Sequence, residues 1–484
     1  MVFNSITFLL FFVSFFLLYW FVPNKNVKFQ NCILLLGSYI FYGWADWRFL
    51  FLIIGISILN YNLGIFIEKT SNQKRRQFLL YVGLIQGIGG LVFFKYFNFF
   101  ITSFNDSFKL LNINCNLQTL NIIVPLGISF FTFRTISYIL DIDKGKIEAS
   151  KDWIVFFNYV SFFPTVLSGP IDKAKTFIPQ LERNRVYNFN HSADGFRQIL
   201  WGLFKKVVVA DNCAILTNSI FEDYHNLPSS SLLLGAFLYT IQIYADFSGY
   251  SDMAIGFSRL LGFNITKNFD FPLFSQNIAE FWRKWHISLT SWLTEYVFTP
   301  LSIAFRDFGT FGLILAILVN FTIIGIWHGA NWTYVLFGFL HGIYFIPLII
   351  KGTMNKKKKI AKDKLLPSFN EFINIVSTLT LVMLTMIIFR SETIVKAFEY
   401  YRGLFSKSFF SIPILHLKDS FLGVTLFFIF LLFCIEWLGR DQQYGIANLF
   451  ANKPRVYRWS FYYLIAMVIF IFAASNQQFI YLQF

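Results

Sequence analysis

The feature that most constrains this chain is a series of apolar runs, each about as long as a bilayer is thick. The first is "ITFLLFFVSFFLLYWF", Ile6 to Phe21. It has no basic segment before it and no small-residue cleavage site after it, so we expect a retained helix rather than a signal peptide. Runs of about 18 or more apolar residues are typical of transmembrane helices. Further candidate spans lie near 31–43, 49–67, 78–99, 121–140, 153–168, 195–210, 231–256, 311–327, 332–350, 371–389, 419–438 and 459–474.

The composition supports a membrane protein. Charged residues make up 14% of the chain and aromatic residues 21%, with a mean hydropathy of +0.56, whereas a soluble domain carries about 25% charged residues. We therefore expect an all-α polytopic membrane protein with about eleven transmembrane helices. Segments too short or too polar to cross alone, such as 153–168, are expected to be re-entrant or interfacial.

The net charge of +15 is best explained by basic loops that set the orientation of the helices in the membrane. Basic residues gather in the short loops 69–77, 355–364 and 452–458, which the positive-inside rule places in the cytoplasm. Lys25 and Lys28 follow the first run and place the N-terminus outside. Because the basic runs are brief and flank apolar spans, they do not indicate nucleic-acid binding.

The four cysteines are scattered and form no CxxC element, which argues against a disulfide framework or a zinc site.

We expect one integral membrane domain over residues 1–484, arranged in three zones. Residues 1–120 are N-terminal helices with few polar groups inside the apolar runs, and residues 370–484 are C-terminal helices. Residues 121–350 hold nearly all the unusual polar and aromatic motifs. No internal repeat is visible, which argues mildly against transporter folds built from two related halves. The chemistry is therefore expected in the zone 121–350.

Arg134 lies well inside the apolar segment "VPLGISFFTFRTISYILDI". An arginine at the bilayer centre costs about 2.5–3.5 kcal/mol on insertion scales, so it should face a protein interior or a cavity. The alternative is an arginine that snorkels or pairs for purely structural reasons. The later segment "FFPTVLSGPIDK", 162–173, has two prolines and a glycine that break helices. It reads either as a re-entrant turn beside a cavity or as an interfacial loop.

Two acids lie in "QIYADFSGYSDMAIG", 242–256. Gln242 and Asp246 are four residues apart and share one face of a helix. Asp246 and Asp252 need partners at membrane depth, and Arg134 and Arg283 are the basic residues we expect to supply them. The segment is either a polar wall of a substrate cavity or a buried ion pair that fixes helix packing.

The segment "NIAEFWRKWHISLTSWLTEYVFTPL", 277–301, has the pattern of an amphipathic helix. Phe281, Trp285, Leu289 and Trp292 fall on one helical face. Trp282 and His286 are four apart on another face, beside the basic Arg283. This pattern predicts a helix that dips into the bilayer without crossing it. A packed, hydrogen-bonded His286 is the alternative to a functional one.

Two histidines lie in "GIWHGANWTYVLFGFLHG", 325–342. His328 and His341 are 13 residues apart, which is about 220° around an uninterrupted helix. Either the helix breaks near Gly329 and Asn331, which would put His328 at a helix end inside the protein, or only one histidine lines a cavity. Metal binding is disfavoured because the chain has no HExxH and no ligand close to His328 in sequence. A serine hydrolase is disfavoured because no G-x-S-x-G element occurs.

What remains is a histidine that works without a protein nucleophile. A neutral imidazole can take a proton from an acceptor hydroxyl as that hydroxyl attacks an acyl carbonyl. It can also carry the acyl group itself. Burial disfavours the charged ring and so keeps it available as a base.

Taken in order, these motifs strongly resemble the membrane-bound O-acyltransferase (MBOAT) family, and most closely its alginate and peptidoglycan O-acetyltransferase type. "PLGISFFTFRTISYILD", "FFPTVLSGPI", "QIYADFSGYSDMAIG", "EFWRKWHISLTSWL" and "GIWHGANWTYVLFGFLHG" carry the likeness. The resemblance implies helices around a central funnel or tunnel. It implies catalytic roles for His328 and His286. The candidate supporting or tunnel residues are Trp327, Asn331, His341, Arg283, Gln242, Asp246 and Arg134.

The resemblance also implies a division of labour across a bacterial inner membrane. A cytoplasmic thioester, expected to be acetyl-CoA, supplies the acyl group, and no cofactor or metal stays bound. Hydroxyls of an exported polysaccharide, or a periplasmic SGNH-type acetyltransferase partner, accept it. The competing functions are a transporter or flippase for lipid-linked sugars, with Asp246, Arg134 and the histidines as a relay, and a non-catalytic scaffold of an export complex.

Overall fold

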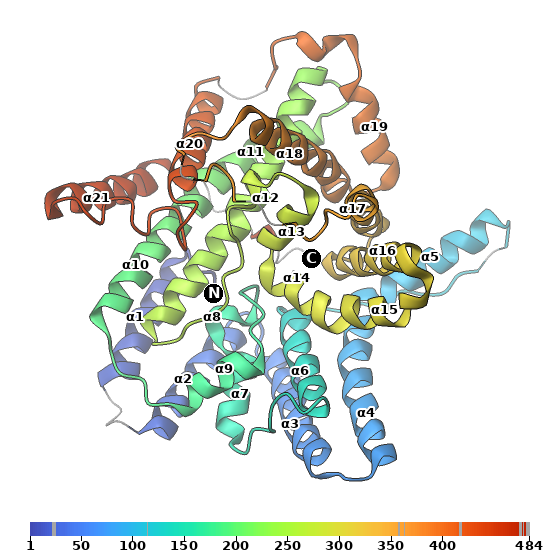
Figure 1. The fold of residues 1–484 in the computed structure, drawn as a ribbon, viewed down its shortest axis with the longest axis vertical. Helices are drawn as coiled ribbons and strands as arrows, with labels where there is room; N and C mark the ends of the chain where they lie inside the picture. Colours follow the sequence, from blue (N-terminus) through green and yellow to red (C-terminus); the bar gives the residue numbers. More distant parts are fainter. Residues whose placement is uncertain are drawn as a thin grey trace. The chain divides into compact units, whose positions relative to one another are not determined.

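The structure is a computed structural model of the whole chain. It describes residues 1–21, 26–113, 115–356, 359–362, 364–415, 419–473, 477 and 479–480. Lys25, residues 357, 358 and 363 of the basic loop, and residue 474 at the end of the last expected span lie outside the described residues. Every regular element in the described part of the chain is helical (Figure 1). The predicted all-α polytopic architecture is therefore confirmed.

Seven helical stretches among the described residues are long and apolar enough to cross a membrane. They are Arg48–Lys69, Gln73–Leu110, Arg306–His328, Trp332–Ile350, Phe369–Arg390, Phe421–Leu438 and Arg455–Phe472. The other expected spans form shorter or more polar helices, such as the 16-residue Ile6–Phe21. The total of about eleven spans stays a prediction.

The chain divides into two compact units, each described here by itself. The first comprises residues 1–196 and 254–266, and the second 197–253 and 267–484. The helices of the first unit are α1 (Ile6–Phe21), α2 (Val27–Gly43), α3 (Arg48–Lys69), α4 (Gln73–Leu91), the π-helix η1 (Val92–Tyr96), α5 (Phe97–Leu110), α6 (Ile128–Asp143), α7 (Trp153–Ser161), α8 (Phe163–Val166) and α9 (Ala174–Glu182). Two helices, α10 (Phe189–Leu203) and α12 (Ser229–Leu260), contribute residues to both units.

The remaining elements belong to the second unit. They are η2 (Phe204–Ala210), α11 (Asp211–Glu222), η3 (Pro272–Phe274), α13 (Ile278–Lys284), α14 (Ile287–Leu293), η4 (Thr294–Phe298), α15 (Thr299–Ala304), η5 (Arg306–Phe308), α16 (Gly309–His328), α17 (Trp332–Ile350), α18 (Phe369–Arg390), α19 (Ile394–Leu404), η6 (Lys407–Phe410), α20 (Asp419–Leu438) and α21 (Arg455–Phe472).

In the first unit, helix α6 is shorter than the expected span 121–140. It begins only at Ile128, because Gly127 adopts a left-handed conformation with φ of 72°. A Cβ atom at Gly127 would come within 2.3 Å of the carbonyl oxygen of Val166, so a side chain cannot be accommodated there. Nearly every residue of α6 is buried. The helix is therefore a core element packed against α3 and α4.

In the second unit, α16 and α17 form a closely packed helical hairpin (Figure 1). Glycines at the crossing let the two backbones approach. A Cβ atom at Gly325 would come within 2.1 Å of the Tyr334 carbonyl oxygen, and one at Gly338 within 2.2 Å of the Phe321 carbonyl oxygen. Small residues allow this kind of approach between membrane helices. The crossing fixes where α16 ends, and α16 ends at His328.

The single amphipathic helix expected over 277–301 is wrong. Helix α13 ends at Lys284, and α14 starts at Ile287. Between them His286 adopts a left-handed conformation with φ of 45°, which an α-helix cannot continue through. Trp282 and His286 therefore do not share a helical face. Both side chains are buried in protein, so the segment is not a helix lying in the bilayer surface.

Candidate functional site

The His286 side chain is held by Asn268. Atom Nδ1 of His286 lies 3.1 Å from Oδ1 of Asn268, and the same oxygen accepts the backbone N–H of Ser288 at 3.2 Å. The Asn268 amide group donates to Oγ of Ser251 at 3.2 Å. Since Oδ1 of Asn268 can only accept, Nδ1 of His286 carries the hydrogen. The lone pair of the neutral ring is then on Nε2, as a base requires.

His286 is fully buried among aromatic rings. Phe247 lies edge-on to it with ring centroids 4.7 Å apart, and Trp327 with centroids 5.6 Å apart. Burial lowers the pKa of His286 well below its usual range, and the nearby His328 lowers it further. His286 therefore stays neutral at physiological pH, as expected of a buried histidine that acts as a base or hydrogen-bond acceptor.

His328 occupies the last position of α16, and the helix break predicted at "HGAN" is confirmed. Gly329 is extended, and the Asn331 side chain caps α17 by accepting the backbone N–H of Thr333 at 3.0 Å. The His328 ring is 3% exposed in its buried pocket of aromatic side chains. Trp327 and Phe389 lie edge-on to it, with ring centroids 5.1 and 5.2 Å away. Trp327 thus contacts both His286 and His328.

His341 is held through both of its nitrogens. The indole N–H of Trp282 donates to Nδ1 at 3.1 Å. Since Nδ1 accepts, Nε2 carries the hydrogen and donates to Oγ1 of Thr385, also at 3.1 Å. The ring is fully buried. These contacts tie α13, α17 and α18 together, which is the arrangement expected of a supporting residue.

The expected partners of the two acids of α12 are wrong. Asp246 pairs with Lys206 at 2.7 Å, and Asp252 pairs with Lys205 at 2.6 Å. Gly202 and Gly249 make this possible, because their backbones touch where α10 crosses α12 and the two lysines follow directly in η2. The side chain of Arg283 instead donates to the backbone carbonyls of Met354 and Lys356.

Further groups complete this buried ion cluster. Lys206 also binds Asp211 at 2.8 Å, and the backbone N–H of Ile480 donates to Asp246 at 2.8 Å. Lys205 lies 3.8 Å from Glu436, which accepts the Tyr244 hydroxyl at 2.6 Å. Gln242, one turn before Asp246, is 8% exposed, and its Oε1 accepts no hydrogen bond from the described residues. The acids of α12 thus serve a buried ion-pair network, the structural one of the two interpretations.

Arg134, in the first unit, is buried and binds the irregular segment 162–173. Its guanidinium donates to the carbonyls of Tyr159, Val160 and Pro170 and to the hydroxyl of Thr165. All of 163–172 is buried, so the short helix α8 and the irregular backbone that follows it are covered by protein. The contacts are those of a residue that organises a broken helix, and a role in a tunnel stays a prediction.

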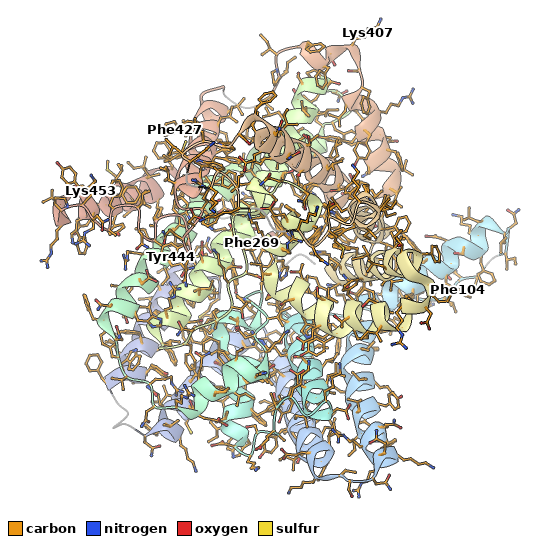
Figure 2. The ribbon with its side chains drawn as sticks, in the orientation of Figure 1. Phe104, Phe269, Lys407, Phe427, Tyr444 and Lys453 are labelled. Carbon is orange, nitrogen blue, oxygen red and sulfur yellow. The ribbon has the colours of Figure 1, made fainter. Side chains whose placement is uncertain are left out.

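Sequence reasoning missed Asn268, Lys205 and Lys206. Asn268 lies 18 residues before His286 in an irregular segment, and no local pattern marks it. The two lysines could have been found, because "GLFKKVVVA" puts two charges inside an apolar run. Phe269, which follows Asn268 and is labelled in Figure 2, packs edge-on against Trp285 with ring centroids 5.1 Å apart.

No group of three or more His, Cys, Asp or Glu side chains suited to a metal occurs among the residues that the structure describes.

Comparison with protein families matches residues 150–389 to the model of the membrane-bound O-acyltransferase family. This stretch includes His286, His328, His341 and the paired lysines and aspartates around α12, whereas Glu436 lies beyond it. It ends at Phe389, the ring that packs on His328.

Comparison with curated proteins finds relatives along most of the chain. The probable alginate O-acetylase AlgI of Pseudomonas aeruginosa is 35% identical over 84% of this chain and 75% of its own length. The peptidoglycan O-acetyltransferase of Helicobacter pylori is 32% identical over 78% of this chain and 74% of its own length. The teichoic acid D-alanyltransferase of Streptococcus thermophilus is 32% identical over 54% of this chain and 68% of its own length.

Proposed function

Because the chain belongs to the membrane-bound O-acyltransferase family and is a multi-pass membrane acyltransferase, we propose that it transfers an acetyl group from cytoplasmic acetyl-CoA to hydroxyls of an extracytoplasmic polysaccharide. The observation that carries the proposal is that the Trp327 ring packs against both His328 and His286. The relatives named for alginate and peptidoglycan acetylation support a polymer as the acceptor.

His328 is the proposed general base. Its neutral ring takes the proton of the acceptor hydroxyl while that oxygen attacks the thioester carbonyl. The carbon–sulfur bond then breaks, and the departing thiolate takes the proton from the imidazolium. The alternative order, in which the ring first accepts the acetyl group and then passes it to the hydroxyl, uses the same residue. The buried aromatic surroundings exclude water, which would otherwise hydrolyse the thioester.

His286 is the proposed companion of His328. Its Nδ1–H is committed to Asn268, so its Nε2 is an acceptor that can hold a hydroxyl or a transferred proton. Trp327, Asn331 and His341 support the pair by fixing the end of α16, the start of α17 and the position of α13. Gln242, Asp246, Arg283 and Arg134 remain proposed supporting residues.

The proposed setting is the inner membrane of a bacterium. The basic loops 69–77 and 355–364 would then face the cytoplasm, where their charge favours an anionic thioester such as acetyl-CoA. An SGNH-type acetyltransferase on the other side is the proposed partner that completes transfer to the polymer.

The test is acetylation of extracellular polymer in cells that carry His328→Ala or the wild-type chain. General-base catalysis contributes about 10²- to 10⁴-fold, so the variant should lose nearly all polymer-bound acetate. Membrane abundance of both proteins serves as the folding control. Normal acetate in the variant would refute the catalytic role. Loss of polymer export, with acetate per polymer unchanged, would instead indicate a transporter, and no change in either would indicate a scaffold.

A further inference from the structure

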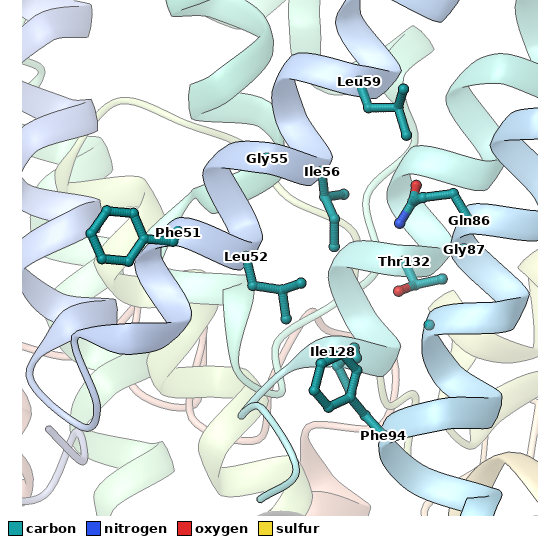
Figure 3. Close-up of a pocket in the computed structure, with 11 residues that line it drawn as sticks. Phe51, Leu52, Gly55, Ile56, Leu59, Gln86, Gly87, Phe94, Ile128 and Thr132 are labelled. Carbon is teal, nitrogen blue, oxygen red and sulfur yellow. The ribbon is translucent and has the colours of Figure 1, made fainter. Parts of the chain in front are cut away.

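A hollow in the first unit is lined by none of the histidines and has no role in the proposed chemistry. It has a volume of about 330 Å³ and is walled by α3, α4, η1 and α6 (Figure 3). The lining residues are Phe51, Leu52, Gly55, Ile56, Leu59, Gln86, Gly87, Gly90, Phe94, Ile128 and Thr132. Only Gln86 and Thr132 bring polar side chains to the wall, and Oε1 of Gln86 is already engaged by Asn60 at 2.9 Å.

Glycines create this hollow. A Cβ atom at Gly55 on α3 or at Gly90 on α4 would meet nothing within 4 Å, so both positions open onto empty space. Gly87, by contrast, is packed against Ile136, with a Cβ atom 2.9 Å from that side chain. Close helix packing therefore bounds the hollow at Gly87, whereas the missing side chains of Gly55 and Gly90 leave it open.

Two of the helical stretches that line the hollow are candidate membrane spans. Both α3 and the stretch from α4 to α5 are long and apolar enough to cross a membrane. Few side chains of α4 are buried in the protein, which leaves the rest of this helix facing outward. Helices α3, α4 and α6 pack on one another, so the hollow is a recess between membrane helices.

The positions of the lining residues relative to the basic loop 69–77 indicate which leaflet the recess faces. The lining residues come from the first half of α3 and from the last part of α4 and η1. These halves lie at the end opposite to the basic loop 69–77, which joins the two helices. The positive-inside rule puts that loop in the cytoplasm, so the recess opens toward the outer leaflet.

We propose that this recess binds one fatty acyl chain of an outer-leaflet phospholipid. An apolar cavity of about 150 Å³ holds one benzene molecule, so the recess has room for about twice as many carbon atoms. A single extended hydrocarbon chain matches both the size and the apolar wall of the recess.

The experiment uses the full chain reconstituted in vesicles of phosphatidylethanolamine and phosphatidylglycerol, with a trace of phosphatidylglycerol that carries a photoreactive diazirine near the end of one acyl chain. After illumination, mass spectrometry of peptides locates the label. We expect labelling of 51–59 and 86–94 to exceed that of the outward-facing α21 several-fold. Gly55→Leu and Gly90→Leu fill the recess from two helices and should each lower that labelling at least fivefold.

Gly89→Leu is the matched control. Gly89 is on α4 beside Gly90, and a Cβ atom there also meets nothing within 4 Å, but Gly89 does not line the recess. This variant should label like the wild-type chain. The proposal fails if residues 51–59 and 86–94 of the wild-type chain are labelled no more than α21. It also fails if Gly55→Leu and Gly90→Leu are both labelled there as strongly as Gly89→Leu. Because the wild-type comparison alone can refute it, the proposal stays testable even if one variant does not fold.

Discussion

Atom Nδ1 of His286 lies 3.1 Å from Oδ1 of Asn268, and this contact decides which nitrogen of a fully buried ring carries its hydrogen. The amide oxygen of Asn268 also binds the backbone of Ser288, and its amide nitrogen binds Ser251. We therefore expect Asn268 to act as a positioning residue, with an effect that can be separated from that of the histidine.

Replacing Asn268 by Ala should leave His286 free to rotate or to take the other tautomer. We expect acetyl transfer to fall by about 100-fold, the loss that a misplacement of about 1 Å causes in an active site. Initial rates of polymer acetylation in membranes measure it. Asn268→Asp keeps an acceptor at the same place and should retain more activity than Asn268→Ala. Equal losses in the two variants would contradict the positioning role.

His341 and His328 should respond differently to substitution. His341→Ala removes the acceptor of Trp282, which leaves its buried indole N–H unsatisfied at a cost of about 1–3 kcal/mol. We expect its thermal unfolding in detergent to shift downward clearly. His328→Ala should unfold close to the wild-type temperature but lose transfer. The assignment is wrong if the two variants exchange these properties.

Acid should destabilise the protein through His286. Its folded-state pKa is far below the value of about 6.5 of an unfolded chain. Below about pH 6.5 the unfolded state binds a proton that the folded state does not, so stability falls by about 1.4 kcal/mol per pH unit until the folded-state pKa is reached. Above pH 6.5 this contribution is fully present. Unfolding temperatures between pH 5 and 7.5 should therefore depend less steeply on pH in His286→Asn than in the wild-type chain.

The hairpin of α16 and α17 should not tolerate a methyl group at its crossing. In Gly338→Ala the new Cβ atom would lie 2.2 Å from the Phe321 carbonyl oxygen, so the helices must separate. Overpacking of this kind costs about 1–3 kcal/mol. Transfer should fall as well, because His328 ends the displaced helix. Gly423→Ala in α20, where a Cβ atom meets nothing within 4 Å, is the control and should change neither unfolding temperature nor activity.

The stability of the protein should depend on the charge balance of the buried ion cluster. Lys206→Met leaves Asp246 and Asp211 without their shared ammonium, and breaking a buried pair costs about 3–5 kcal/mol. The double variant Lys206→Met with Asp246→Asn removes one stranded charge and should recover part of that loss. Unfolding temperatures of the two single variants and the double variant form the required cycle. Purely additive losses would show that the pair is not coupled.

Periodicity and motif position predicted much of this architecture. The apolar runs indicated the membrane helices, and "HGAN" indicated the break after His328, because Gly and Asn disfavour helix continuation. The helix expected through His286 failed for a physical reason. Its amphipathic pattern is real, but the backbone turns at His286 to bond with Asn268, a tertiary contact that no local pattern encodes. The partners of Asp246 and Asp252 were missed likewise, because Gly202 and Gly249 bring them together across about 40 residues of chain.

Under the proposed function, the length of α17 sets how far the acyl group is carried across the membrane. Its 19 residues run from just after His328 to Ile350, and the basic loop 355–364 follows closely. A helix of that length measures about 28 Å, close to the full hydrocarbon thickness. With the loop on the cytoplasmic side, as the positive-inside rule predicts, His328 is near the opposite face of the bilayer. Under the proposed function, the thioester carbonyl would then be carried across most of the membrane before it reacts, and the new ester would form close to the face where the polymer lies.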